Sequence, residues 1–168
     1  KTSIRLEKEV SSILLNKAIH QMHIGKHKNG GACYLTNAKF VSISKSYFVA
    51  NKGYLGAAIF VKSATEFKNH HTIFHENFAS HLGGGVFSHS VHTFVASFCT
   101  FFRNNALRGG GGALLKNGRN ISIIMNTFAS NSGHRGSALY VIVCVTFFLQ
   151  NNTLSQNSAG KFTAQIHK

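Results

Sequence analysis

The stretch Gly83-Gly84-Gly85-Val86-Phe87 decides the fold, because variants of it recur along the chain. In each copy a glycine is followed by small residues and then by two large apolar ones. The other copies are Gly30-Gly31-Ala32-Cys33-Tyr34, Gly56-Ala57-Ala58-Ile59-Phe60, Gly111-Gly112-Ala113-Leu114-Leu115 and Gly136-Ser137-Ala138-Leu139-Tyr140. Their first glycines are 26, 27, 28 and 25 residues apart. A fixed period of this length indicates a repeat architecture.

A second motif has the same period and consists of a large apolar residue followed, three positions later, by Asn. Its copies are Phe48/Asn51, Phe74/Asn77, Phe102/Asn105, Phe128/Asn131 and Leu154/Asn157. The asparagines are 26, 28, 26 and 26 residues apart. Because two independent motifs share one period, we interpret the chain as a set of structural repeats.

The segments between the motifs have the length and composition of β-strands. Residues 40–43, 94–98 and 121–124 are rich in β-branched and aromatic residues, and Asn, Gly, Ser or Lys bounds them. No leucine columns of the kind that a leucine-rich repeat needs are present, and glycine doublets disfavour a helical solenoid. The sequence therefore predicts an all-β fold: a right-handed parallel β-helix of five to six coils, with about 26 residues per coil.

The repeat columns then take structural roles. Glycine allows a sharp corner, so Gly30, Gly56, Gly83, Gly111 and Gly136 are expected at corners. Asparagine tolerates a left-handed bend, and its amide can bond the Asn in the coils above and below. We therefore expect a ladder of Asn51, Asn77, Asn105, Asn131 and Asn157. Phe48, Phe74, Phe102, Phe128 and Leu154 are expected to stack in the interior.

Repeats that pair a Gly-Gly-Ala-Ile/Leu element with a Phe-x-x-Asn element resemble those of the chlamydial polymorphic outer-membrane protein family. Similar repeats occur in surface proteins of the pectin-lyase-like class. The resemblance covers residues from about 30 to 160. It implies an exported β-helix with a role in adhesion, at the cell surface or outside the cell.

Residues 1–29 differ from the repeats at 30–168 and form a separate N-terminal cap in this interpretation. Val10, Ile13, Leu14, Ala18 and Met22 recur at three- and four-residue steps, which predicts a helix of roughly four turns. The alternative is a less regular coil that precedes the first repeat. A cap is expected because an open solenoid end exposes strand backbone that can recruit another chain.

The charge balance is strongly basic. Eighteen Lys and Arg face four acidic residues, all of them Glu, for a net charge of +14 in 168 residues. Such a field favours anionic partners. The aromatic residues lie in repeat columns and are not interleaved with Arg, so we expect anionic glycans or another protein surface as partner rather than nucleic acid. No apolar run is long enough for a transmembrane helix.

Candidate catalytic and metal-binding groups are few. Glu66 and Glu76 with a neighbouring His could serve as acid and base in a glycan-cleaving enzyme, which is the enzymatic alternative. The histidines His20, His23 and His27, and those between residues 70 and 92, lack cysteine partners at zinc-ligand spacing. Cys33, Cys99 and Cys144 are interpreted as small core residues. We therefore expect no catalytic residue, no metal site and no cofactor.

One further column bears on binding. Adjacent strand residues face opposite ways, so an aliphatic column inside would place the next column outside. That outer stripe would contain Tyr34, Phe60, Phe87, Leu115 and Tyr140. In the alternative, these side chains fill the core, and only the basic loops are left as a binding surface. The function expected from the sequence is therefore non-enzymatic: structural, adhesive or carbohydrate-facing, with polyanion binding as a further alternative.

Overall fold

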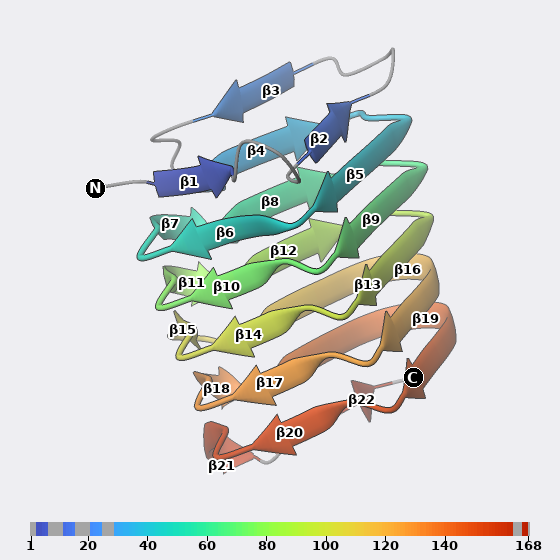
Figure 1. The fold of residues 1–168 in the computed structure, drawn as a ribbon. Helices are drawn as coiled ribbons and strands as arrows, with labels where there is room; N and C mark the ends of the chain where they lie inside the picture. The colour runs from blue at the N-terminus through green and yellow to red at the C-terminus, as the bar shows by residue number, and fades with distance from the viewer. Residues whose placement is uncertain (1–2, 7–11, 16–20, 25–28, 163–165, 168) are drawn as a thin grey trace.

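The computed structural model describes residues 3–6, 12–15, 21–24, 29–162 and 166–167, with side chains between residues 29 and 159. It confirms an all-β parallel solenoid of about five coils, spaced about 26 residues apart (Figure 1). The part of the chain with described placement contains no helix. Each coil has four sides, and equivalent strands of successive coils pair in parallel to build four faces.

The first two faces share one continuous sheet. The first face comprises β4 (Cys33–Thr36), β8 (Ile59–Lys62), β12 (Val86–His89) and the initial parts of β16 (Ala113–Ile124) and β19 (Leu139–Gln150). The second face comprises β5 (Phe40–Ser44), β9 (Glu66–His70), β13 (Thr93–Ser97) and the remaining parts of β16 and β19.

The other two faces consist of shorter strands. The third comprises β6 (Ser46–Val49), β10 (Ile73–His75), β14 (Thr100–Phe102), β17 (Thr127–Ala129) and β20 (Thr153–Ser155). The fourth comprises β7 (Lys52–Leu55), β11 (Phe78–Leu82), β15 (Asn105–Ala106), β18 (Ser132–Arg135) and β21 (Ser158–Phe162). Near the C-terminus, β22 (Ile166–His167) pairs with β19.

Each coil turns at four residues in the left-handed backbone region. The first corner is a glycine in every coil: Gly30, Gly56, Gly83, Gly110 and Gly136. The second, third and fourth corners use other residues, for example Ser63, His71 and Glu76 in the second coil. Counted along the chain, the first three steps between corners are always 7, 8 and 5 residues, and only the step across the fourth face varies between 6 and 7.

That variable step explains an error of one residue in the predicted register. In the second and third coils, the fourth face is one residue longer, and a register irregularity lies between Ala79 and Leu82. The corner is therefore Gly110 instead of Gly111, and the ladder residue is Asn104 instead of Asn105. Phe101, instead of Phe102, lies in the interior stack.

The predicted asparagine ladder is confirmed at the remaining positions. It runs through Asn51, Asn77, Asn104, Asn131 and Asn157. The Nδ2 group and the backbone N–H of each Asn donate to Oδ1 of the Asn in the next coil, at 2.8–3.1 Å. Nδ2 also donates to a backbone carbonyl of the preceding coil, as from Asn104 to Phe74 at 2.9 Å. The inner ladder residues Asn77, Asn104 and Asn131 therefore bind both neighbouring coils.

A second polar column, which the sequence motifs did not reveal, follows the third corner. It contains Ser46, Thr72, Cys99, Asn126 and Asn152. Each of these side chains donates to the carbonyl two residues earlier, across the left-handed residue. From His70 onward these carbonyls also accept a backbone N–H from the preceding coil, so the column adds a second hydrogen bond at the corner.

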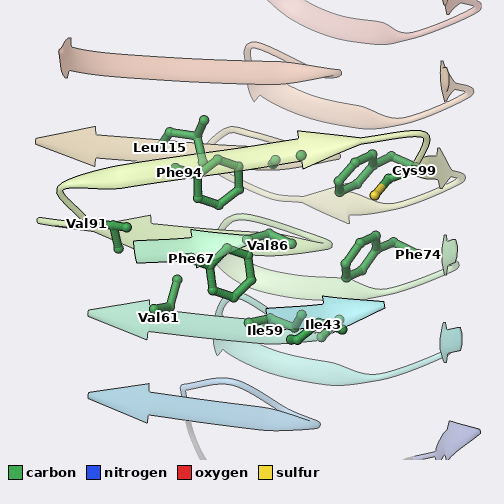
Figure 2. Packing of buried hydrophobic residues seen from close by; sticks show 14 of the residues in the cluster. Ile43, Ile59, Val61, Phe67, Phe74, Val86, Val91, Phe94, Cys99 and Leu115 are labelled. Atoms are coloured by element: carbon green, nitrogen blue, oxygen red, sulfur yellow. The ribbon is translucent and has the colours of Figure 1, made fainter. Parts of the chain in front are cut away.

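The interior between the faces is apolar and close-packed (Figure 2). Phe48, Phe74, Phe101 and Phe128 stack with ring centroids 4.6–5.2 Å apart. Leu154, which was expected to continue this stack, lies in the last coil and is 50% exposed. A second stack, of Phe67 and Phe94, fills the space behind the second face.

One buried amide differs from the hydrogen-bonded asparagines of the ladder. Asn69 is 1% exposed, and neither its amide nitrogen nor its amide oxygen has a hydrogen-bond partner within the described part of the chain. Its register partners in the neighbouring coils are Ile43 and Ala96. Burying an unpaired amide costs about 1–3 kcal/mol. Asn69 is therefore a local source of instability.

The expected N-terminal helix is wrong for the residues that the structure describes. Ile13 and Leu14 lie in β2 (Ser12–Leu15), and Met22 lies in β3 (Gln21–Ile24). Val10 and Ala18 lie outside the described residues. With β1 (Ser3–Leu6), these strands pair antiparallel with β6, β5 and β4 of the first coil. Strands are favoured here because they satisfy the backbone groups at the edge of the first coil, which a helix cannot do.

Replacing the ladder residue Asn104 by Ala should lower the free energy of unfolding by about 1–3 kcal/mol, because buried amide bonds to two coils are lost. Asn105 is only half-buried and has no side-chain hydrogen bond among the described residues. Asn105→Ala should therefore stay within about 0.5 kcal/mol. Equal shifts of the thermal midpoint for the two variants would contradict the assigned register.

Asn69→Leu should raise the thermal midpoint, because Leu has as many side-chain heavy atoms as Asn and needs no hydrogen bond. The matched control is Asn77→Leu, the same change at a buried Asn of the ladder. This control should lower the midpoint, since it breaks bonds to both neighbouring coils. Thermal unfolding followed by circular dichroism would measure both, and shifts of the same sign would refute the interpretation.

Candidate functional site: a basic depression beside the fourth face

The expected outer stripe of aromatic side chains is buried. Phe60 and Phe87 are each 5% exposed, and their rings stack at 5.4 Å. Tyr34 stacks on Phe60 at 5.0 Å, while Leu114, instead of Leu115, is the register partner of Phe87. Leu115 belongs to the interior.

Phe60, Phe87, Leu114 and Tyr140 form a buried cluster that is separate from the main core. They are buried because Leu55 and Leu82, at the end of the fourth face, cover them. The expected exposed stripe is therefore absent.

The column of side chains that covers this cluster changes in the later coils, although Leu114 and Tyr140 remain buried. The residues that precede the corner glycines form a column of Leu55, Leu82, Gly109 and Arg135. The carbonyl of each accepts a hydrogen bond from the backbone N–H of the corner glycine one period earlier in the chain. Gly109 has no side chain to cover the cluster, and a Cβ added there would lie 3.2 Å from the ring of Tyr140. The change from Leu to Gly opens a depression at this point.

The depression has a volume of about 370 Å³, within the usual range for small-ligand sites. Leu82, Tyr140 and Ile142 provide apolar groups in its lining. Four basic side chains complete the lining: His81, Arg108, His134 and Arg135. Both arginines and His134 are exposed, whereas His81 is half-buried and stacks on the ring of Tyr54 at 4.8 Å.

No carboxylate neutralises these basic groups within the described part of the chain. The glutamates whose side chains are described are Glu66 and Glu76, and neither lines the depression. Glu66 forms an ion pair with Lys68, with 2.9 Å between Oε1 and Nζ. Glu76 lies 3.3 Å from His75 and 3.7 Å from Arg103. The depression therefore has positive charge and no internal counterion.

Sequence reasoning missed this site. The signal that could have revealed it is the pair of residues before each corner glycine, which reads Tyr-Leu, His-Leu, Arg-Gly and His-Arg in successive coils. Aligned in one column, these pairs show the loss of a covering leucine next to new basic residues. The one-residue error in the third coil concealed the alignment.

The histidines do not converge into a metal site. Among the described residues, no group of three His, Cys or Glu side chains could hold an ion. His70 and His71 form an edge-to-face pair, and His70 Nδ1 lies 2.6 Å from Ser97 Oγ. The side chains of His20, His23 and His27 lie outside the described set. What the geometry offers is a site for an anion instead.

The cysteines are free thiols, and two of them are deeply buried. Burial raises the pKa of Cys33 to about 12. Burial also raises the pKa of Cys99 to about 12, and backbone hydrogen bonds to Thr72 and Ser97 act weakly in the opposite direction. Cys144 is half-buried. Cys33 and Cys99 are therefore core residues, in agreement with the interpretation from the sequence.

Comparison with models of protein families, with curated proteins and with solved structures finds no match for this chain. The resemblance to chlamydial surface proteins thus stays a prediction from the repeat motifs. In the described residues, no helix is long and apolar enough to cross a membrane.

The thiols provide a direct check of this arrangement. At pH 7.5, iodoacetamide should label Cys144 in the folded protein, and Cys33 and Cys99 only after unfolding, because a pKa of about 12 leaves almost no thiolate at either position. Mass spectrometry of tryptic peptides measures the labelling. A Cys144→Ser variant should remain unlabelled while folded, and rapid modification of either buried thiol would contradict the packing.

Proposed function

We propose that this solenoid is a non-enzymatic scaffold that binds an acidic carbohydrate in the basic depression. The observation that carries the proposal is the set of four basic side chains around one hollow, with no carboxylate beside them. Arginine fits a carboxylate or sulfate through two parallel hydrogen bonds. An anion in the depression would therefore supply the counterion that the described side chains lack.

The apolar part of the lining favours a sugar over a simple ion. Leu82, Tyr140 and Ile142 can contact the C–H surface of a sugar ring while Arg108 and Arg135 bind its acidic group. Unspecific binding of nucleic acid is less well supported, because bases need open aromatic faces on which to stack. The aromatic rings beside the depression are instead stacked against one another and buried.

The net charge of +14 supports the same class of ligand, since it would draw a polyanion to the protein and make binding dependent on salt. An adhesive role on an exported or surface protein, as the repeat motifs suggest, is compatible with such binding. In this proposal the fold displays charged side chains on a rigid support.

The test is calorimetric titration with a sulfated heparin-derived disaccharide, using maltose as the neutral probe. The sulfated sugar should bind and maltose should not. Arg108→Gln should weaken binding about tenfold or more, because a hydrogen bond to a charged group is lost. The matched control is Arg119→Gln, the same change at an exposed Arg outside the depression, and it should change affinity less than about twofold.

Three results would refute the proposal: no binding of the sulfated disaccharide, equal binding of maltose, or equal effects of the two Arg variants. Competition by single-stranded DNA of equal charge at equal concentration would refute the choice of carbohydrate as the ligand class.

A further inference from the structure

A second basic feature lies on the outer surface of the first face. Lys62, His89 and Lys116 are direct register partners at the ends of β8 and β12 and within β16. Parallel strands stack about 4.8 Å apart, so the three side chains form a column along the solenoid axis. The two lysines are exposed, and His89 is half-buried between them.

This column has no acidic neighbour in the part of the chain with described side chains. Glu66 pairs with Lys68, and Glu76 pairs with Arg103 and His75. The polar contact of the His89 ring is with Asn117, whose Nδ2 lies 3.4 Å from Nε2. Three basic groups in adjacent strands, without a counterion, make an arrangement that an external anion would stabilise.

The column runs alongside the depression, because His81 and Leu82 of the lining belong to the same coil as Lys62. Lys116 is the register partner of Ile142, and Ile142 lines the depression. From Ile142 to Lys62 is three coil steps, a distance of about 14 Å. A chain bound in the depression could therefore extend directly along the column.

We propose that the ligand is a linear polyanionic carbohydrate that lies along the solenoid axis, held by the depression on one side and by the adjacent column of Lys62, His89 and Lys116 on the other. This inference rests on the proposed function and names the form of its ligand. It distinguishes a long acidic glycan from a single acidic sugar, for which the depression alone would suffice.

His89 couples this binding to protons. Burial lowers its pKa, and the charges of Lys116 and Lys62 lower it further. The other groups that face it are Asn117 and the ring of Phe87, whose centroid lies 6.3 Å away. An anionic chain across the column would offset the repulsion from both lysines and raise the pKa of His89. Binding would then take up a proton, and affinity would increase as the pH falls.

The experiment compares the sulfated disaccharide with a heparin-derived dodecasaccharide on the same protein. The longer chain should bind about a hundredfold more tightly, because a second contact adds to the first within one molecule. The double variant Lys62→Gln/Lys116→Gln should bring the affinity for the dodecasaccharide close to that for the disaccharide. It should leave disaccharide binding unchanged.

The matched control is Lys39→Gln/Lys52→Gln, which removes the same charge at two exposed positions outside both features. It should retain most of the advantage of the longer chain. Equal affinities for the two probes, or equal losses in both double variants, would overturn the inference while leaving disaccharide binding, and thus the proposed function, intact. Failure of both probes to bind would instead refute the proposed function.

Proton uptake gives an independent readout. Titration with the dodecasaccharide at pH 6.5, in buffers with different heats of ionisation, counts the protons taken up. His89→Gln should reduce this number, whereas His92→Gln, a change at an exposed histidine outside the column, should not. Equal uptake by both variants would contradict the role of His89.

Discussion

Hydrogen bonding between successive coils is the constraint on which the rest of the structure depends. Within the coils, each strand pairs in parallel with the equivalent strand one coil later. A side chain therefore points to the same side of the sheet, inward or outward, as its register partner in the neighbouring coil. A coil can therefore change its side chains freely on the surface, but its second, third and fourth corners stay at fixed distances along the chain from the first. The constant steps of 7, 8 and 5 residues between corners follow from this requirement. The buried asparagine ladder strengthens it, because the amides of Asn77, Asn104 and Asn131 bind both neighbouring coils.

The sequence predicts the solenoid because its strictest positions carry recognisable residues. Glycine marks the first corner because the backbone there is left-handed. Asparagine marks the position after the fourth corner because its amide forms the ladder. Prediction failed where this signature weakens. Adjacent candidates, Asn104 and Asn105, hid a one-residue extension of the fourth face. At the N-terminus, three- and four-residue spacing suggested a helix, but spacing within so short a segment says nothing about the unpaired coil edge that strands can bind.

The candidate site lies where the constraint is weakest. The fourth face is the one side whose length varies between coils, and its column of Leu55, Leu82, Gly109 and Arg135 changes in size and charge. The first two of these side chains pack against the buried aromatic cluster, whereas the glycine contributes no side chain to its cover. A depression lined by basic groups thus results from substitution in one column on a fixed support. Repeat periodicity cannot reveal such a site, because the site consists of a departure from the repeat.

Charge connects this site to the energetics of the fold. Self-repulsion in a strongly basic chain disfavours the compact state, and the two glutamates with described side chains are already paired with Lys68, Arg103 and His75. In the depression and in the column of Lys62, His89 and Lys116, several basic groups lie close together, and the charges of Lys116 and Lys62 add to burial in lowering the pKa of His89. A bound anion would relieve that repulsion only in the folded state, where these groups are brought together. Ligand binding and fold stability would then be linked through the same charges, so a surface that repels itself when empty is also one suited to holding a polyanion.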